Sequence, residues 1–311
     1  MIGSYADAVV ARLEDSDWLV RKTSLETLGK LEPATLAQYA FAVVARLEDS
    51  EGAVCLEALA TLRQLEPPTL AQHACAVVAR LEDYDEDVRE TALETLGKLE
   101  PATLAQHADA LSAMLEDDNG EVRYVALETL GKLEPETLAQ HADAVVARLE
   151  DSEDICVREE ALETLGKLDP ATLAQHAEAV VARLEDEDEW VPKEALMTLG
   201  KLEPATLAQY ANAVLNLLED TYFVYIDNTR ITMSALATRT LRGLPRFVTH
   251  DVDFEAPNLR SRLLGRLGWY KCRLILRVRS HVIYWYALPY RPSGPGHARD
   301  VEAWDRMLEG Y

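Results

Sequence analysis

The sequence predicts an all-α fold in which helix pairs stack into an elongated solenoid. Two observations predict it. One sequence motif recurs along most of the 311 residues with a period of 34 residues, which is typical of repeat arrays. Within every copy, apolar residues recur at the three- and four-residue spacing of a helix buried on one side. The copies begin at Tyr5, Tyr39, His73, His107, His141 and His176, and the fifth has one extra residue near Ile155.

Each copy is expected to form two helices. The first begins near a proline such as Pro33, because the fixed φ and missing N–H of proline suit a first helical turn. Its apolar stripe is Leu36, Ala40, Val43, Val44 and Leu47. After an Asp-rich turn, the stripe of the second helix is Val54, Ala58, Leu59, Leu62 and Leu65. This helix ends before the next proline, and glycines near its end, such as Gly97, are expected to let neighbouring backbones approach closely.

The repeats also set the predicted domain organisation. Neither helix of a pair buries its stripe alone, so stacking supplies one continuous core. We expect six repeats over residues 1–209, a degenerate seventh repeat over 210–245, and a basic, aromatic-rich C-terminal cap or interaction module over 246–311. Ser4 and Asp7 match a helix-capping pattern, which predicts that Met1 lies near a structural end.

Charge divides the chain in the same way. The net charge is −23, but residues 246–311 hold 11 basic and 7 acidic residues, so the first 245 residues carry 20 basic and 47 acidic ones. A polyanion would be repelled by the repeats and attracted only to the tail. The chain has four scattered cysteines, no apolar run of membrane-spanning length and no secretory signal pattern. These features predict an intracellular protein; the cytoplasm is the preferred compartment, and the nucleus or a plastid is left open.

The repeated text resembles a known family. The segment LEDYDEDVRETALETLGKL, from Leu81 to Leu99, is similar to the HEAT repeat, especially the short form first associated with phycobilin lyases. The resemblance implies a right-handed α-α superhelix of six to seven two-helix repeats. It also implies a ladder between neighbouring repeats, in which an Asp that ends the first helix meets an Arg that opens the second. The matching pairs are Asp15/Arg21, Asp83/Arg89, Asp117/Arg123 and Asp151/Arg158, and the ladder is interrupted at Cys55 and Pro192.

The copies differ mainly in the turn and in the first turn of the second helix. Partner recognition requires a constant core and a surface that varies. We call the surface formed by these turns and first helical turns the variable strip; aromatic and aliphatic side chains at its solvent edge supply contact area on binding. Neutral drift of solvent-facing turns is the alternative. The predicted partner-binding residues are Trp18, Leu19, Lys22, Leu56, Tyr84, Tyr124, Val125, Ile155, Trp190 and Lys193.

No catalytic, cofactor or metal site is expected. His73, His107, His141 and His176 occupy one repeat position, so stacking separates them by about 10 Å, too far to share a zinc ion bound at about 2.0–2.1 Å. No Gly-rich phosphate loop, G-x-S-x-G or H-E-x-x-H motif occurs. The family resemblance leaves chromophore lyase activity as an enzymatic alternative.

The basic tail gives mixed signals. Spacing of Leu263, Leu267, Leu274 and Val278 favours a helix that ends before Pro289, whereas alternation in RVRSHVIYWY favours a strand; the helix is preferred. Three roles are open: capping the last repeat, gripping an acidic partner or nucleic acid, and lying in an anionic membrane interface. The basic residues concerned are Arg260, Arg262, Arg266, Lys271, Arg273, Arg277 and Arg279.

Together these observations predict a non-enzymatic scaffold or adaptor. Its acidic surface would draw in a basic or amphipathic segment of another protein, and charge would raise the rate of encounter more than the final affinity. Nucleic acid or an anionic membrane is expected to bind only through residues 260–299.

Overall fold

The computed structural model describes residues 2–188, 190–210, 213–214, 223–226, 229–232, 270–278 and 281–290. The chain divides into two compact units, Met1–Glu203 and Pro204–Tyr311.

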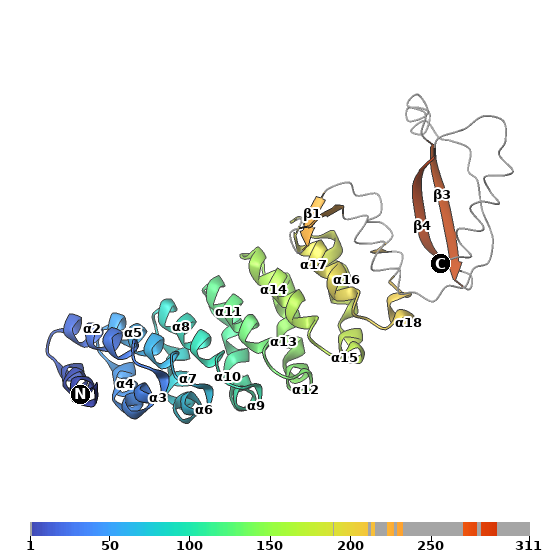
Figure 1. Ribbon diagram of the computed structural model, residues 1–311. Coiled ribbons are helices and arrows are strands. Elements are labelled where there is room, and N and C mark those ends of the chain that lie inside the picture. The colour runs from blue at the N-terminus through green and yellow to red at the C-terminus, as the bar shows by residue number, and fades with distance from the viewer. Residues whose placement is uncertain are drawn as a thin grey trace. The chain divides into compact units, whose positions relative to one another are not determined.

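The first unit is a stack of helix pairs in two rows (Figure 1). The second helices of the six repeats form one row, and each contacts the next along the chain. They are α2 (Trp18–Leu28), α5 (Gly52–Leu62), α8 (Glu86–Leu96), α11 (Gly120–Leu130), α14 (Ile155–Leu165) and α17 (Trp190–Leu199). This arrangement confirms the predicted solenoid of two-helix repeats.

The first helices form the other row, but they are not the continuous helices that the apolar stripe predicted. In the second repeat, α3 (Pro33–Leu36), η2 (Ala37–Tyr39), α4 (Ala40–Val44) and η3 (Ala45–Glu48) follow one another. The break lies at Tyr39, whose φ of −110° and ψ of 2° leave the α-helical region. The stripe still faces the core, because Leu36, Ala40 and Leu47 stay buried.

The break recurs at the equivalent histidine of the third to sixth repeats, whereas α1 of the first repeat continues through Tyr5. The first repeat contributes α1 (Ile2–Val10) and η1 (Ala11–Glu14) to the row of first helices, and the third repeat contributes α6 (Pro67–Leu70), η4 (Ala71–His73), α7 (Ala74–Val78) and η5 (Ala79–Glu82). The fourth repeat contributes α9 (Pro101–Leu104), η6 (Ala105–His107), α10 (Ala108–Ala113) and η7 (Met114–Glu116), and the fifth contributes α12 (Pro135–Leu138), η8 (Ala139–His141), α13 (Ala142–Ala147) and η9 (Arg148–Glu150). The sixth repeat contributes α15 (Pro170–Gln175), α16 (Ala177–Ala182) and η10 (Arg183–Glu185).

The core lies between the two rows and runs through all six repeats. Val43 of the first row and Val54, Leu59 and Leu62 of the second row are 0% exposed, and their equivalents in the later repeats are also buried. Full burial of one such side chain contributes about 1.5–3 kcal/mol. The repeated text is therefore constant because each copy supplies one layer of a shared interior.

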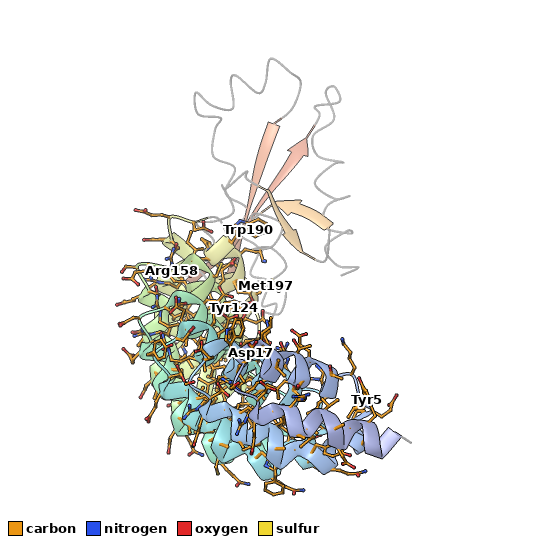
Figure 2. All side chains as sticks on the ribbon, turned by 90° about the vertical axis from the view of Figure 1, so that its left-hand side faces the viewer. Tyr5, Asp17, Tyr124, Arg158, Trp190 and Met197 are labelled. Atoms are coloured by element: carbon orange, nitrogen blue, oxygen red, sulfur yellow. The ribbon has the colours of Figure 1, made fainter. Side chains whose placement is uncertain are left out.

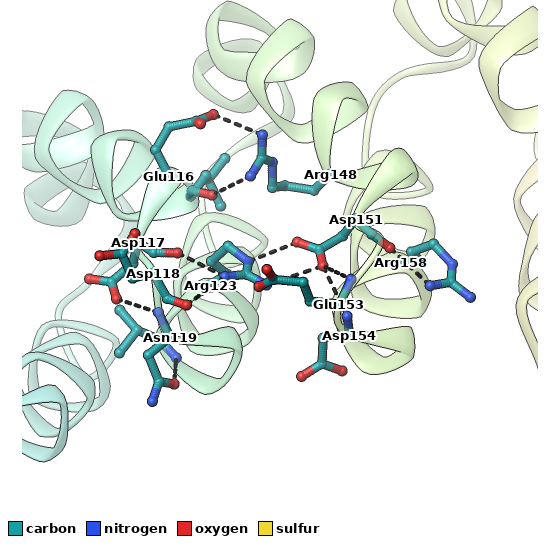
Figure 3. Close-up of polar contacts among 12 residues, drawn as sticks. Glu116, Asp117, Asp118, Asn119, Arg123, Arg148, Asp151, Glu153, Asp154 and Arg158 are labelled. Atoms are coloured by element: carbon teal, nitrogen blue, oxygen red, sulfur yellow. Dashed lines mark hydrogen bonds and ion pairs between the residues drawn. The ribbon is translucent and has the colours of Figure 1, made fainter.

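A row of arginines joins consecutive repeats (Figure 3). Arg123 donates from Nε and Nη2 to the carboxylate of Asp151 in the next repeat at 2.7 and 3.1 Å, and from Nη1 to the carbonyl of Asp117 in its own turn at 2.8 Å. The equivalent carboxylate contacts are Arg21 to Asp49, Arg89 to Asp117 and Arg158 to Asp186. The ladder implied by the sequence is present, with each carboxylate supplied by the following repeat.

Each acidic member of this ladder also shapes its own turn. Asp151 accepts hydrogen bonds from the amides of Glu153 and Asp154 at 3.1 and 3.0 Å. Burial alone would raise the pKa of Asp151, but these amides and the Arg123 guanidinium outweigh it, so the pKa lies below its usual value. The aspartate is thus held ionised at the junction of two repeats.

Two further rows of hydrogen bonds cross the repeat junctions. Nη1 of Arg46 donates to the Leu13 carbonyl of the preceding repeat at 2.7 Å, and the hydroxyl of Thr61 donates to the Leu25 carbonyl at 3.2 Å. Equivalent arginines and threonines repeat these contacts at Arg80, Arg148, Arg183, Thr95, Thr129, Thr164 and Thr198. The threonine bonds add a second donor to carbonyls that already accept a backbone amide, as Leu25 does from Gly29 at 2.8 Å, so their effect is to link neighbouring repeats.

Gly97 and Gly131, near the ends of α8 and α11, leave room for a side chain of the following repeat and not for the predicted close backbone approach. A Cβ at Gly97 would lie 2.8 Å from Nζ of Lys132, and one at Gly131 would lie 2.7 Å from Nζ of Lys167. The space is thus occupied by a lysine of the following repeat, whose charge is favourable at a helix C-terminus.

The second unit contains α18 (Pro204–Leu207) and two antiparallel hairpins, formed by β1 (Phe223–Ile226) with β2 (Thr229–Thr232) and by β3 (Tyr270–Val278) with β4 (His281–Tyr290). The preference for a helix in the tail is wrong over residues 270–290, because alternation and β-branched residues outweigh the incomplete helical spacing. Likewise, β1 and β2 lie where a second helix of a seventh repeat would fall. The seventh repeat stays a prediction.

Among the described residues, no helix is both long enough and apolar enough to cross a bilayer.

Candidate partner-binding surface

The variable strip is positioned by the N-termini of the second helices. Asp154 precedes α14, and its carboxylate accepts from the amide of Cys156 at 2.8 Å; Asp188 accepts from the amide of Trp190 at 2.8 Å. Asp17, Asp85 and Asn119 cap their helices in the same way. Such caps contribute about 1 kcal/mol each and fix the direction in which the first helical turn presents its side chains.

Five predicted partner-binding residues are exposed large hydrophobic side chains. Their exposed fractions are 43% for Trp18, 55% for Leu19, 87% for Tyr84, 42% for Ile155 and 37% for Trp190. Lys22, Leu56, Tyr124 and Lys193 are half-buried. Among the labelled side chains of Figure 2, Tyr124, Met197 and Trp190 lie along one edge of the helix stack and Arg158 lies on the opposite edge.

Val125 is the exception, and its inclusion in the strip is wrong. It is only 6% exposed, because its position, three residues after the core residue Val122, belongs to the buried side of α11. The same position is occupied by Glu160 in α14 and by Glu194 in α17. The two later repeats therefore place carboxylates where α11 has an aliphatic side chain.

These carboxylates line a groove across α11, α14 and α17. The hollow has a volume of about 450 Å³, and Glu121, Glu159, Glu160, Glu163 and Glu194 contribute five acidic side chains to its lining. Tyr124, Cys156 and Lys193 complete it. We call this hollow the acidic groove.

Glu160 is the most buried carboxylate of the acidic groove. It is 8% exposed, and its two polar contacts are long: the Thr164 hydroxyl donates to Oε1 at 3.5 Å, and Nζ of Lys167 lies 3.9 Å from Oε1. Burial, with a further contribution from the charge of Glu163, raises the pKa of Glu160 to about 7. Its side chain is thus held near the midpoint of titration at neutral pH.

Burial shifts the pKa of three neighbouring groups of the groove in the same direction. Burial raises the pKa of Glu159 and of Glu194, and it also raises the pKa of the Tyr124 hydroxyl. Lys193 is the one cation of the groove lining; its Nζ lies 3.9 Å from Oε2 of Glu194 and 5.3 Å from the centre of the Trp190 ring. A single lysine leaves the groove with an excess of negative charge.

The histidine position forms a row of its own on the first helices. Nε2 of His141 lies 3.9 Å from Oδ1 of Asp109, Nδ1 of His176 lies 3.9 Å from Oδ1 of Asp143, and the Tyr39 hydroxyl donates to Asp7 at 3.1 Å. His73 instead packs edge-to-face against Phe41. No group of three or more potential metal ligands occurs within the described part of the chain.

The tail residues of the predicted basic site are only partly described. Lys271, Arg273 and Arg277 belong to β3, where register pairs them with Pro289, Ala287 and Val282 of β4. Arg260, Arg262, Arg266 and Arg279 lie outside the described residues.

Sequence reasoning missed the acidic groove although its signal was present. Glu160 and Glu194 occupy a position that also holds glutamate (Glu57) in the second repeat, but threonine in the first and third repeats and valine in the fourth. A comparison of the copies position by position would have separated them from the solvent-facing glutamates.

Comparison with known proteins addresses the fold. A family model described as HEAT repeats matches residues 74–144 and 142–225. One engineered protein is similar with a TM-score of 0.56 and 17% identity over 76% of this chain and 67% of that chain, and another with a TM-score of 0.51 and 18% identity over 66% and 97%. A designed armadillo repeat protein has a TM-score of 0.50 and 17% identity over 65% and 98%. A comparison with curated proteins gave no match.

Proposed function

A family model of HEAT repeats matches residues 74–144 and 142–225, and from this premise we propose that the chain is a non-enzymatic scaffold whose acidic groove captures a basic, amphipathic segment of another protein. Lysine or arginine side chains of the segment enter the groove. Apolar side chains of the same segment contact the exposed edge residues Ile155 and Trp190. Buried aromatic anchors and desolvated charges then carry most of the binding free energy.

The burial of Glu160 is the observation that carries this proposal. A carboxylate at a position where α11 has Val125 costs stability, and groups with strongly perturbed pKa values in a cleft are typical of functional sites. A guanidinium or ammonium group from the partner supplies a closer counter-charge than Lys167, whose Nζ lies 3.9 Å from Glu160 and 3.5 Å from Glu163. Because Glu160 is only 8% exposed, an ion pair with it is screened less than one at an exposed surface.

Cation binding is therefore linked to proton release. Below the folded-state pKa of about 7, Glu160 must lose a proton before it pairs with a cation, so affinity falls as the pH falls. The decrease approaches about tenfold per pH unit for one fully coupled group. An exposed acidic surface, with carboxyl groups of ordinary pKa near 4.3, would show no such dependence around neutrality.

The test is titration of the full chain with a fluorescent, helical lysine–leucine peptide, followed by anisotropy between pH 6 and pH 8. Glu159→Gln with Glu194→Gln should weaken binding at least about tenfold, because two desolvated charges lose their cationic partners. Glu82→Gln with Glu150→Gln changes the net charge equally at exposed residues of the first row and serves as the matched control. Equal weakening by both double variants would contradict capture by the groove.

The exposed edge is tested separately. Replacing Trp18, Tyr84, Tyr124 and Trp190 together by alanine should weaken peptide capture, since it removes aromatic contact area. The melting temperature should change little at Trp18, Tyr84 and Trp190, which are exposed, and somewhat more at the half-buried Tyr124. Unchanged capture would contradict a role for the strip in recognition.

A further inference from the structure

One junction of the arginine ladder lacks its arginine. Four junctions hold a guanidinium between the turn of one repeat and the aspartate of the next, and these arginines are Arg21, Arg89, Arg123 and Arg158. Between the second and third repeats, Cys55 occupies the arginine position, and the aspartate that would receive the guanidinium is Asp83. This junction therefore keeps the acidic member of the ladder without the basic one.

The junctions that hold an arginine show which groups receive a guanidinium. Nε and Nη2 of Arg123 donate to the two carboxylate oxygens of Asp151, and Nη1 donates to the carbonyls of two turn residues of its own repeat at 2.8 and 3.2 Å (Figure 3). The equivalent carbonyls of the second repeat belong to Asp49 and Ser50, and neither accepts a hydrogen bond within the described part of the chain. Three acceptor groups that suit a guanidinium thus lie at the junction without one.

The turn of the second repeat keeps the backbone shape that positions these carbonyls. Asp49 has a φ of −66° and a ψ of 142°, close to the −62° and 145° of Asp15 and the −63° and 145° of Asp117. The carbonyls of Asp15 and Asp117 both accept from a ladder arginine. Across the junction, the Asp83 carboxylate accepts from the amide of Asp85 at 3.2 Å, as the Asp49 carboxylate does from the amide two residues after it. The acceptors are therefore preformed.

Without a guanidinium, Asp83 is more exposed than the other ladder aspartates. Its side chain is 16% exposed, against 5–7% for the equivalent aspartates Asp49, Asp117, Asp151 and Asp186. The adjoining helix α5 begins with Gly52 and Ala53, the smallest pair of residues at this position in the six repeats. A Cβ at Gly52 would meet Oδ2 of Asp85 at 3.5 Å, an ordinary contact distance, so the start of α5 is not crowded. A side chain of another molecule can therefore reach Asp83 from solvent.

Among the described residues, no neighbouring group takes the place of the arginine. Cys55 is buried, and burial, with a smaller contribution from the charge of Asp83, raises the pKa of its thiol to about 11, so the thiol is neutral at physiological pH. Arg80 lies 3.7 Å from Asp83, but the equivalent Arg46 lies 4.0 Å from an aspartate that also holds a ladder arginine. Nη1 of Arg80 instead donates to a carbonyl of the preceding repeat at 3.1 Å. Arg80 thus belongs to a different row and leaves the ladder position open.

We propose that this junction binds an arginine side chain of another protein. We call the Asp83 carboxylate and the carbonyls of Asp49 and Ser50 the ladder gap. Two N–H groups of the incoming guanidinium donate to Asp83, and a third donates to the two carbonyls. Arginine is favoured over lysine, since its planar fork donates to both oxygens of a carboxylate, whereas an ammonium group acts as a point charge. The ladder gap lies between the second and third repeats and does not depend on peptide capture by the acidic groove.

The test is a titration of the full, isotopically labelled chain with N-acetyl-arginine amide, followed by nuclear magnetic resonance. The reporter is the amide of Asp85, which donates to the Asp83 carboxylate and should shift when a guanidinium binds there. A dissociation constant on the order of a millimolar is expected for so small a probe. N-acetyl-lysine amide carries the same charge and should bind at least about tenfold more weakly. Equal binding of the two probes, or an unmoved Asp85 amide, would overturn the proposal.

Variants separate the ladder gap from the rest of the acidic surface. Asp83→Asn should weaken arginine binding at least about tenfold, because it removes the charged acceptor. Glu82→Gln, at the exposed carboxylate that precedes Asp83, changes the net charge equally and is the matched control; it should change binding less than about twofold. Cys55→Arg should abolish binding, because the chain's own guanidinium then fills the gap. Retained binding in Asp83→Asn or in Cys55→Arg would overturn the proposal.

The test does not depend on any one variant. Circular dichroism checks the folding of each variant, and the comparison of the arginine and lysine probes uses the unaltered chain, so it decides the question even if a variant does not fold. Glu159→Gln with Glu194→Gln, which removes charge from the acidic groove, should leave the shift of the Asp85 amide unchanged. The two proposals therefore fail separately.

Discussion

Replacing Glu160 by glutamine is expected to stabilise the protein at neutral and alkaline pH. The pKa rises from the ordinary carboxyl value of 4.5 to about 7 on folding, mainly because of burial. At 1.36 kcal/mol per pKa unit, this difference corresponds to about 3 kcal/mol that the ionised carboxylate costs the folded state. Glutamine keeps the size and the contact with Thr164 and removes the charge.

The sign of the effect depends on pH in a defined way. Below the unfolded-state pKa near 4.5, Glu160 is protonated in both states and imposes no electrostatic cost. As the pH rises through the folded-state pKa of about 7, the stabilisation associated with the neutral form is lost. The gain from Glu160→Gln should therefore be close to zero at pH 4.5 and should approach about 3 kcal/mol at pH 8.

Urea denaturation followed by far-ultraviolet circular dichroism measures this difference at the two pH values. Glu150→Gln, at an exposed carboxylate of the first row, is the matched control and should change stability by less than about 0.5 kcal/mol. If the variants differ in the slope of unfolding free energy against urea concentration, the repeats no longer unfold cooperatively. The slopes are therefore compared before the free energies of unfolding. An equal gain at both pH values, or a loss of stability at pH 8, would refute the assignment of Glu160 as a buried, destabilising carboxylate.

Three further predictions concern the ladder and the tail. Arg123→Ala should cost about 3–5 kcal/mol in urea denaturation, since it leaves the carboxylate of Asp151 buried without its main partner; a cost below about 1 kcal/mol would contradict the ladder's role. Cys55→Arg should raise the melting temperature by offering Asp83 the guanidinium it lacks, and a lowered melting temperature would show that the site cannot hold the side chain. Deleting residues 260–299 should abolish retention on a polyanion column, because this segment holds nine basic residues and no acidic one; unchanged retention would place polyanion binding elsewhere.

The fold of the first unit was predictable because the six repeats can be aligned with one another. Six copies of one text reveal which positions are constant, and constant apolar positions such as Leu59 and Leu62 proved to be the shared core. The interruption of the first helices in the second to sixth repeats was not predictable from apolar spacing. Spacing reports which side of a segment is buried, and a helix with 3₁₀ turns keeps the same buried side as a regular one.

The candidate site was predictable only in part. Trp18, Tyr84 and Trp190 are exposed as expected, because side chains at a turn have no neighbouring repeat to cover them. Val125 was misplaced because variability between copies was taken as a sign of exposure. The residue type at a buried position can also vary between copies, because it follows the side chain that the neighbouring helix places against it. Glu160 was overlooked for the converse reason, since its residue type suggested solvent.

In the tail, two periodicities competed within a short segment. Leucines at 263, 267 and 274 matched one side of a helix, whereas residues 270–290 alternate and form β3 and β4. Basic residues between the apolar ones are compatible with both patterns, so composition did not decide between them.

The extra residue near Ile155 shows how the repeat tolerates change in length. Arg158 lies seven residues after Asp151, while Arg123 lies six residues after Asp117, yet each donates to the carbonyl of its aspartate at 2.8–2.9 Å. The bend absorbs the insertion, and the helices on both sides keep their spacing. Evolution can therefore lengthen these bends and add side chains there without disturbing the inner layers, which makes each junction a place where new binding preferences are acquired at little expense in folding.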